Sequence, residues 1–311
     1  MAPSSTPPLS GAPSLDLLEL DLAAEALLTG HPAARPPAVI GHGEVSVVLA
    51  WPPSHPTWAV KRLPSFASDS AAEEYRALLA TYVLRLASRG VDVVATSLFT
   101  TPGPRGRRHA YLVQPLLSSQ DLLSRRLRSC TAEQAEPWLA DVTDLVLRVV
   151  DDGCGLDAQV ANWAVTPPGT PPAAEGSGLR YVDVSTPFLN DGEKELLDQR
   201  WILSPYPAVL RPALRRFAMP QIVAHYHSPD TVLLDVAGNL LREGLDRHLE
   251  VLVAVAARRG LVLSRKDATA YARSDERTWH WLHRARLADR WWQRTVRRRS
   301  YPFLLPERRH G

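Results

Sequence analysis

The sequence GLDAQVANWAV at residues 155–165, followed after a Pro/Gly-rich excursion by LRYVDVSTP at residues 179–187, decides the fold. Two short apolar or β-branched runs in it, 163–165 and 179–184, are bounded by Gly and Pro. This pattern predicts the two strands of a hairpin. Such a hairpin would bring Asn162, just before its first strand, close to Asp183 near the end of its second.

The side chains that this hairpin would gather suit a metal-dependent transfer reaction. An amide oxygen from Asn162 and a carboxylate from Asp183 are hard ligands of the kind that Mg²⁺ prefers. Asp157 lies five residues before Asn162 in a tight turn and would face the same space, where it could accept a proton from a hydroxyl group. A purely structural turn is the competing interpretation of the Asp157–Asn162 spacing.

A second motif lies near the N-terminus, in VIGHGEVSVVLAW at residues 39–51. Glycines such as Gly41 and Gly43 let backbone N–H groups approach phosphate oxygens, because no Cβ stands in the way. The pattern Gly-x-Gly-x-x-Ser-x-Val, with Ser46 as its sixth residue, therefore indicates a phosphate-covering loop. An ordinary hairpin with both glycines at its turn is the alternative.

Lys61 lies in the next expected strand, WAVKRL at residues 58–63, at the end of Ala-Val-Lys, and is one of only three lysines in the chain. Residues 70–87 have helical periodicity, and Glu74 is expected on the inward face of this helix. A charge on an inward face is costly unless it is paired. Lys61 is the natural partner, and a solvated Glu74, with Glu73 in its place, is the alternative.

In order along the chain, these motifs resemble the protein-kinase-like superfamily, and especially its small-molecule branch of aminoglycoside and choline phosphotransferases. The resemblance covers residues 37–190. It implies an α+β fold in two lobes, a small antiparallel β-sheet lobe and a mainly helical lobe. It also implies ATP and Mg²⁺ as cofactors and a hydroxyl of a small molecule as acceptor.

The resemblance further implies a role for each motif. The amides of residues 41–46 would cover the phosphates of ATP, and Lys61 held by Glu74 would neutralise them. Gln114 lies where the superfamily has the hinge that binds adenine. Asn162 and Asp183 would hold Mg²⁺, and Asp157 would orient the acceptor hydroxyl as the catalytic base.

The chain departs from the superfamily pattern in three places. Gly155 and Leu156 replace the His and Arg expected before the catalytic Asp, and Asp183-Val-Ser replaces Asp-Phe-Gly. No Ala-Pro-Glu segment follows. These differences argue against a protein substrate, and they leave open a catalytically inactive pseudokinase that binds a nucleotide or a partner.

The domain boundaries follow from composition and periodicity. We expect a disordered segment at 1–14, the sheet lobe at 15–116, the helical lobe at 117–272 and a basic tail at 273–311. Two further strands are expected at 91–100 and 109–117. The expected helices lie at 15–28, 70–87, 119–128, 135–150, 193–203, 208–218, 231–243, 245–258 and 266–273.

Two polar patterns in the helical lobe remain ambiguous. Asp235, Asn239 and Glu243 recur every four residues along one helix, where a solvated face is favoured over the lining of a substrate pocket. His225 and His227 lack a nearby carboxylate in a matching frame, so no zinc site is expected. Residues 190–270 would form the acceptor pocket and contain no motif that identifies the acceptor.

The composition is that of an ordinary globular protein, with 45% hydrophobic and 22% charged residues. Cys130 and Cys154 are too few for a disulfide framework, and residues 15–28 fit neither a signal peptide nor a membrane span. A cytoplasmic location is therefore expected. Arg supplies 33 of the 36 basic residues, and together with abundant Ala, Leu and Pro this indicates a high-GC bacterial genome.

The last 39 residues contain 11 Arg against 4 acidic residues, with four tryptophans interleaved. Such a segment could bind RNA or an anionic membrane. The favoured interpretation is a helix that docks its indoles on the protein body, because docking uses tryptophan better than exposure to solvent does. Neither nucleic acid nor a membrane is therefore expected as a partner.

Overall fold

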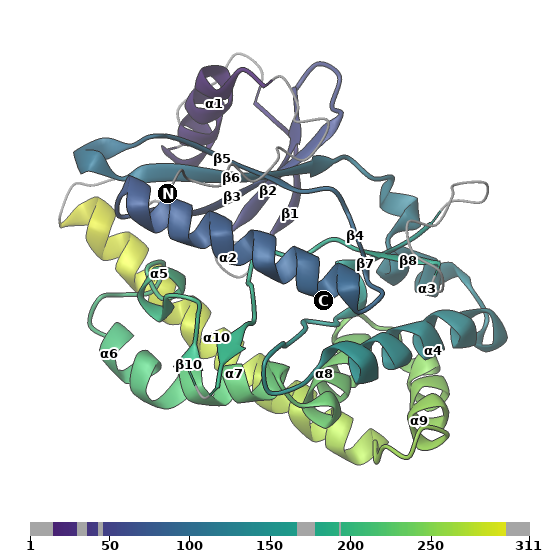
Figure 1. Cartoon of the computed structure of the whole chain (residues 1–311). Coiled ribbons are helices and arrows are strands. Elements are labelled where there is room, and N and C mark those ends of the chain that lie inside the picture. The colour runs from purple at the N-terminus through teal and green to yellow at the C-terminus, as the bar shows by residue number, and fades with distance from the viewer. Residues whose placement is uncertain (1–14, 30–35, 43–45, 167–177, 193, 297–311) are drawn as a thin grey trace, which may run out of the picture. The chain divides into compact units, whose positions relative to one another are not determined.

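The computed structural model describes residues 15–29, 36–42, 46–166, 178–192 and 194–296 (Figure 1). The expected disordered segment, residues 1–14, and Gly43 of the expected phosphate-covering loop lie outside the described residues. The chain divides into two units. A sheet unit comprises residues 1–73, 95–116 and 290–311, and a helical unit comprises residues 74–94 and 117–289.

The sheet unit is built on a five-stranded antiparallel sheet in the order β1-β2-β3-β6-β5. A short 3₁₀ turn, η1 (Pro104–Gly106), connects β5 to β6. The five strands are β1 (Val39–His42), β2 (Val47–Trp51), β3 (Trp58–Phe66), β5 (Ser97–Pro102) and β6 (Arg108–Pro115).

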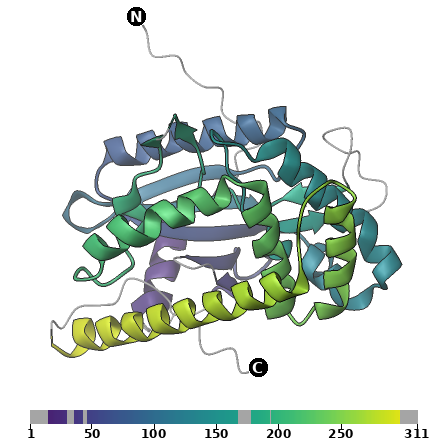
Figure 2. The ribbon, with the colours of Figure 1, turned by 90° about the horizontal axis from the view of Figure 1, so that it is seen from below.

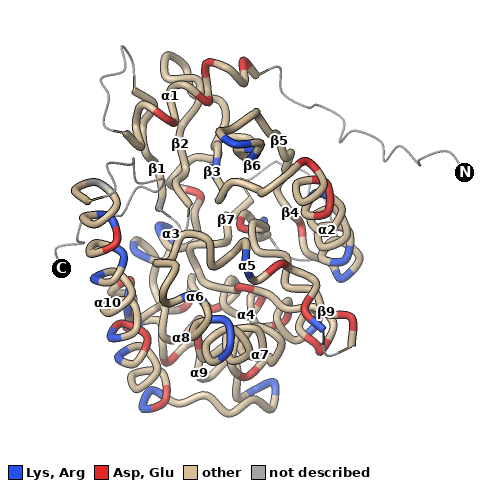
Figure 3. Tube along the Cα trace, turned by 90° about the vertical axis from the view of Figure 1, so that its left-hand side faces the viewer, with Lys and Arg blue, Asp and Glu red and all other residues tan. Residues whose placement is uncertain are grey.

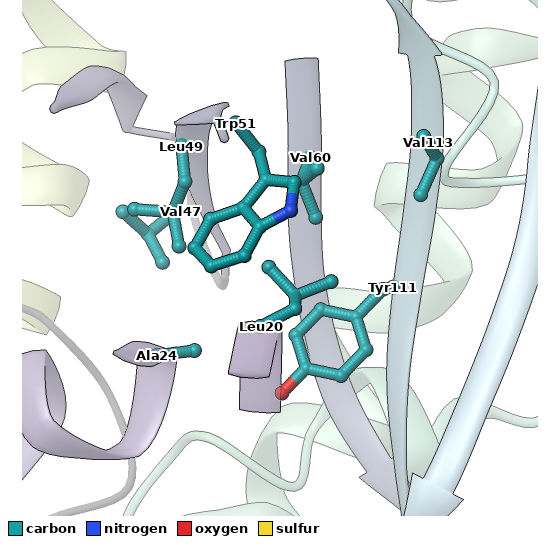
Figure 4. Packing of buried hydrophobic residues seen from close by; sticks show 8 residues of the cluster. All are labelled: Leu20, Ala24, Val47, Leu49, Trp51, Val60, Tyr111 and Val113. Carbon is teal, nitrogen blue, oxygen red and sulfur yellow. The ribbon is translucent and has the colours of Figure 1, made fainter. Parts of the chain in front are cut away.

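The two faces of this sheet have different environments. Helix α1 (Leu17–Thr29) packs on one face, where Leu20 and Ala24 meet the side chains of β2, β3 and β6 in a buried cluster (Figure 4). Lys61 pairs with Val48 on one side and with Leu112 on the other. Because successive side chains of a strand point to opposite faces, Lys61 lies on the face that α1 does not cover.

A buried polar network attaches α1 to the sheet. One oxygen of the Asp21 carboxylate accepts hydrogen bonds from the Thr101 hydroxyl at 2.9 Å, from His109 Nδ1 at 2.9 Å and from the Tyr111 hydroxyl. Burial raises the pKa of Asp21, but the hydrogen bonds from His109 and Tyr111 outweigh it and lower the pKa to about 2. The carboxylate form of Asp21 is therefore the form that the fold stabilises.

The helical unit contains most of the helices. It also contains a three-stranded sheet in the order β4-β8-β7, in which β4 and β8 are parallel, and a two-stranded sheet of β9 and β10. Its strands are β4 (Asp92–Val93), β7 (Trp163–Val165), β8 (Leu179–Tyr181), β9 (Asn190–Asp191) and β10 (Lys194–Glu195).

Helix α2 (Asp69–Ser88) begins in the residues of the sheet unit and continues into the helical unit. The helices that follow it are η2 (Ser119–Asp121), α3 (Leu123–Ser129), α4 (Ala132–Val149), η3 (Val160–Asn162), α5 (Gln199–Ile202), α6 (Arg211–Ala213), the π-turn η4 (Leu214–Ala218), α7 (Met219–Tyr226), α8 (Pro229–Arg242), η5 (Asp246–His248), α9 (Leu249–Ala257) and α10 (Arg265–Thr295). The predicted fold class, α+β with a small antiparallel sheet and a mainly helical part, is confirmed.

Two predicted elements are wrong. The strand expected at 91–100 is two strands, β4 and β5, that belong to different sheets. The helix expected at 193–203 is confined to the four residues of α5, because Asp198 caps it by accepting from the Arg200 amide and β9 and β10 pair before it. The turn between β9 and β10 contains Gly192 with φ of 60°, a conformation that glycine adopts readily.

The C-terminal helix is longer than expected and its tryptophans are not docked. Helix α10 continues across the predicted boundary at residue 272, since residues 265–296 contain neither Gly nor Pro. The four indoles expected to dock keep between 37% and 61% of their surface exposed; they are Trp279, Trp281, Trp291 and Trp292. The docking interpretation is therefore wrong for these side chains.

We predict that Asp21→Ala lowers the free energy of unfolding at neutral pH by about 2 kcal/mol, because the native fold depresses the pKa of this carboxyl group. The folded-state pKa lies near 2 and the unfolded-state value near 3.8, so this contribution is complete above pH 4 and disappears as the pH falls toward 2. Urea unfolding of both proteins across this pH range measures the difference.

Glu19→Ala, at an exposed position of the same helix, is the control and should change stability little at any pH. A stability difference between Asp21→Ala and the wild type that stays constant from pH 5 to the lowest pH at which both fold would contradict the assignment to the Asp21 charge.

Candidate active site

The predicted hairpin is present in the helical unit. Strands β7 and β8 pair antiparallel with Trp163 opposite Tyr181. Beyond this pair, the Val182 amide donates to the Asn162 carbonyl oxygen at 2.9 Å. The backbone therefore fixes Asn162 beside the residue that immediately precedes Asp183.

Asp157 is held at the start of the loop that leads to this hairpin. Its backbone oxygen accepts from the Asn162 side-chain amide at 3.2 Å and from the Tyr181 hydroxyl at 3.1 Å. Its carboxylate accepts from the Gln159 amide at 3.3 Å. Because the Asn162 amide nitrogen is used in this way, its amide oxygen points in another direction and can serve as a ligand.

Asp183 is oriented by Ser185 of the Asp-Val-Ser sequence. The Ser185 hydroxyl donates to one carboxylate oxygen of Asp183 at 2.6 Å, and the Ser185 amide donates to the same oxygen at 3.1 Å. The Ser185 carbonyl in turn accepts from the buried Tyr75 hydroxyl of α2 at 2.9 Å. This departure from the kinase sequence therefore supplies an orienting hydroxyl group.

Negative charge is concentrated around Asp157. Burial raises the pKa of Asp157 well above its usual range, and the neighbouring carboxylates of Asp235 and Asp183 raise it further. Three carboxyl groups thus lie close enough to influence one another. A cation at this place would be stabilised by their combined field.

Helix α8 supplies residues of this site that the sequence did not identify as such. Asp235 and Asn239 are only 3% and 5% exposed. Asp235 accepts from the Gln159 side-chain amide at 2.9 Å, and Asn239 accepts from the Val160 backbone amide at 3.1 Å. The solvated-face interpretation is therefore wrong for these two residues, which hold the loop between Asp157 and Asn162.

A second layer of polar contacts holds Asp235 itself. Its other carboxylate oxygen accepts from Arg242 at 3.2 Å and from the Tyr271 hydroxyl of α10 at 3.1 Å. Arg242 also pairs with Asp275 at 2.6 Å. His225 lies parallel to the Tyr271 ring, with ring centroids 5.4 Å apart, so its imidazole belongs to this network.

Gly155, which replaces the expected His, lies where the backbone is tightly packed. Its amide donates to the Phe188 carbonyl at 2.9 Å, and its carbonyl accepts from the Tyr82 hydroxyl of α2 at 3.0 Å. A Cβ at this position would lie 2.7 Å from the Tyr226 carbonyl oxygen and 2.9 Å from the Phe188 Cβ. Only glycine fits here without a shift of the backbone.

In the sheet unit, the other predicted residues lie on the face of the sheet opposite α1. Gly41, Ser46, Lys61 and Gln114 are all partly exposed, and Gln114 pairs with Ala59, two residues before Lys61. The Gln114 side chain donates to the Thr96 hydroxyl at 2.8 Å. A Cβ on Gly41 would meet only Val48, at an ordinary contact distance of 3.5 Å.

The expected inward position of Glu74 is wrong. Glu74 is exposed, whereas the buried side of α2 carries Tyr75, Leu79, Tyr82 and Leu86. Successive residues of a helix differ by about 100° in direction, so the neighbour of a buried Tyr75 points elsewhere. Glu73 is exposed as well.

The donor set of the helical unit fits a magnesium ion that also binds phosphate. Among the described residues no three His, Cys, Asp or Glu side chains are arranged to hold a metal. Asn162 and Asp183 offer two oxygen ligands, and Mg²⁺ in phosphoryl-transfer sites is commonly held by one or two protein ligands together with substrate phosphates.

The fold and this loop define an α+β protein with a polar, carboxylate-rich site next to a β-hairpin. Residues 30–290 match the model of the family described as "Family of unknown function (DUF6206)". The chain therefore belongs to that family.

Comparisons with individual proteins add little to this. No curated protein matches the chain significantly. The solved structure of WaaP in complex with acyl carrier protein aligns with 15% identity and a TM-score of 0.41, covering 83% of this chain and 95% of that one.

We predict that Asn239→Ala lowers the free energy of unfolding by about 1–3 kcal/mol, because the buried amide of Val160 loses its acceptor. Hydrogen–deuterium exchange of peptides that cover residues 157–162 should accelerate. Asp230→Asn, at an exposed position in the first turn of the same helix, should cost less than about 1 kcal/mol. Unchanged exchange in Asn239→Ala would show that α8 does not hold the loop.

Gly155→Ala and Gly153→Ala form a matched pair, and we predict that only the first is destabilising. The new methyl at 155 must displace the backbone of Tyr226, at a cost of about 1–3 kcal/mol. A Cβ at 153 would meet nothing closer than 3.4 Å. Thermal unfolding measures both variants, and equal stabilities would refute the close packing at Gly155.

Proposed function

We propose that this protein is an ATP- and Mg²⁺-dependent phosphotransferase that acts on a hydroxyl group of a small molecule. The observation that carries the proposal is the hydrogen bond from the Val182 amide to the Asn162 carbonyl, which joins the backbone next to the two proposed ligands, Asn162 and Asp183. The element order supports it, since a lysine-bearing third strand, a long helix and an Asp-x-x-x-x-Asn loop follow one another as in protein-kinase-like enzymes.

Lys61 and Gly41 are the proposed contacts of ATP in the sheet unit. Lys61 lies on the face of the sheet opposite α1, and Gly41 pairs with Val48 on the same face. Ser46 immediately precedes β2, and Gln114 lies on β6. Both of these strands pair with β3. A lysine with a compact ammonium group suits the phosphate oxygens. Gly43 is included in this proposal from the sequence motif alone.

Asn162 and Asp183 are the proposed ligands of Mg²⁺ in the helical unit. When bound, the ion supplies charge neutralisation for the phosphates. The contribution of the protein is to fix the two ligands: Ser185 orients the Asp183 carboxylate, and the side-chain amide of Asn162 is anchored to Asp157.

Asp157 is the proposed catalytic base. The acceptor hydroxyl oxygen forms a bond to the γ-phosphorus while the bond from that phosphorus to the bridging oxygen breaks, and the hydroxyl proton passes to the Asp157 carboxylate. ADP leaves with the bridging oxygen. Tyr181, Gln159 and α8 hold the Asp157 backbone and loop in place, so little reorganisation is needed during transfer.

A pseudokinase is the second candidate, and the sequence before Asp157 favours it. The superfamily has a His or Arg beside the catalytic Asp, whereas Gly155 and Leu156 stand there in this chain. A protein of this kind would bind a nucleotide or a partner without transferring phosphate.

We predict that Asp183→Ala abolishes the thermal shift that ATP and Mg²⁺ give together, because it removes a charged ligand of the ion. Lys61→Met should weaken nucleotide binding at least tenfold, whereas Lys194→Met should have no effect, since Lys194 is an exposed residue of β10. Asp157→Asn should retain binding and lose turnover by at least about 100-fold, the range of general-base catalysis.

Turnover is measured as ADP release across a panel of small-molecule alcohols. Nucleotide binding with no turnover on any acceptor would favour the pseudokinase. Unchanged nucleotide affinity in Asp183→Ala and Lys61→Met would refute the proposed site altogether.

A further inference from the structure

Helix α10 presents a row of arginine and tryptophan side chains to solvent. Seven positions follow one another at intervals of three or four residues, which places them on one face of the helix. All seven are exposed; they are Arg273, Arg277, Trp281, Arg284, Ala288, Trp291 and Thr295. We call them the Arg/Trp stripe, and Figure 2 shows the unbroken helix, in yellow-green, that carries them.

The opposite side of α10 is the side that packs. Ala268 is fully buried, and Arg286 is only 5% exposed, with its guanidinium group over the Tyr206 ring at 5.7 Å. Tyr271 and Asp275 bind Asp235 and Arg242 of α8. The Arg/Trp stripe is therefore not a surface that α10 needs for its attachment within the helical unit.

The Arg/Trp stripe is a positively charged surface. Its three arginines form no ion pair with any residue that the structure describes. Acidic residues do occur on α10, as the red segments among the blue ones in Figure 3 show, but none of them occupies a stripe position. Asp275, for example, is paired with Arg242.

We propose that the Arg/Trp stripe binds the surface of a bilayer that contains anionic phospholipids, with α10 lying parallel to the membrane plane. Arginine binds phosphate groups with a planar fork of donors. Tryptophan favours the level of the lipid headgroups, where its ring is partly apolar and its N–H remains hydrated. Basic helices with aromatic side chains bind membrane surfaces in this way.

The geometry of the stripe favours a flat partner. Trp281 and Trp291 are ten residues apart, which corresponds to about 15 Å along a helix. A straight helix presents a convex surface, whereas proteins that stack single-stranded nucleic acid on aromatic side chains use a groove that follows the backbone. A planar, negatively charged surface can contact both indoles and the intervening arginine at the same time.

The mode of binding is peripheral. Within the described residues no helix is both long and apolar enough to cross a bilayer. The attraction comes from charge and from indole insertion, so it should weaken as salt rises. The proposed membrane binding is the same whether the protein is an active phosphotransferase or a pseudokinase.

The test is sedimentation of the full-length protein with vesicles of phosphatidylcholine alone or mixed equally with phosphatidylglycerol. The wild type should bind only the anionic vesicles. The triple variant Arg273→Gln, Arg277→Gln, Arg284→Gln should bind them about 100-fold more weakly at low salt, because each arginine near the surface contributes to the attraction. The pair Trp281→Gln and Trp291→Gln should weaken binding about tenfold and remove the blue shift of tryptophan fluorescence.

A control removes the same number of charges elsewhere, with Arg215→Gln, Arg216→Gln and Arg265→Gln at exposed positions off the stripe. It should bind like the wild type, and circular dichroism confirms that each variant folds. The proposal is overturned if the wild type does not bind anionic vesicles, or if the control loses as much affinity as the stripe variant. It is also overturned if the stripe is needed for binding poly(U) RNA but not for binding vesicles, or if a chain ending at Val296 loses all vesicle binding.

Discussion

The hydrogen bond from the Val182 amide to the Asn162 carbonyl is the contact on which the candidate site depends. It continues the β7–β8 ladder by one step, so the positions of Asn162 and Asp183 follow from backbone geometry rather than from side-chain choice. The orientation of each side chain is then set by a neighbour, Ser185 for Asp183 and the Asp157 carbonyl for Asn162. A local hairpin thus brings the backbones of Asn162 and Asp183 close together.

The loop before this hairpin needs support from distant parts of the chain. Protein-kinase-like enzymes have a His or Arg beside the catalytic Asp, and here Gly155 lets the Tyr226 carbonyl approach too closely for any side chain to fit. Asp235 and Asn239 hold the loop from the opposite side through Gln159 and the Val160 amide. The loop is therefore held by hydrogen bonds from α8 to its backbone and to one amide side chain.

Much of this arrangement could be predicted from the sequence because it is local. The hairpin, the lysine-bearing strand and the fold class all follow from short-range patterns. The contribution of α8 could not be predicted, since Asp235 and Asn239 meet the loop across 76 and 79 residues of sequence. A sequence with a polar residue every four positions is the same whether that side of the helix faces solvent or forms part of a buried polar network. The wrong prediction for Glu74 has a related cause. If the buried side of a helix is assigned one residue out of register, each side chain is misplaced by about 100° around the helix axis.

Helix α10 shows why composition cannot replace geometry. A boundary at residue 272 followed from the rise in Arg and Trp, yet the backbone has no reason to stop there, because no Gly or Pro interrupts residues 265–296. The same helix uses Tyr271, Asp275 and Arg286 for attachment, and these recur on one side. Since a helix has a second side, Arg273, Arg277, Arg284, Trp281 and Trp291 are exposed on it. Their exposure is thus a consequence of the attachment of α10 by its opposite face.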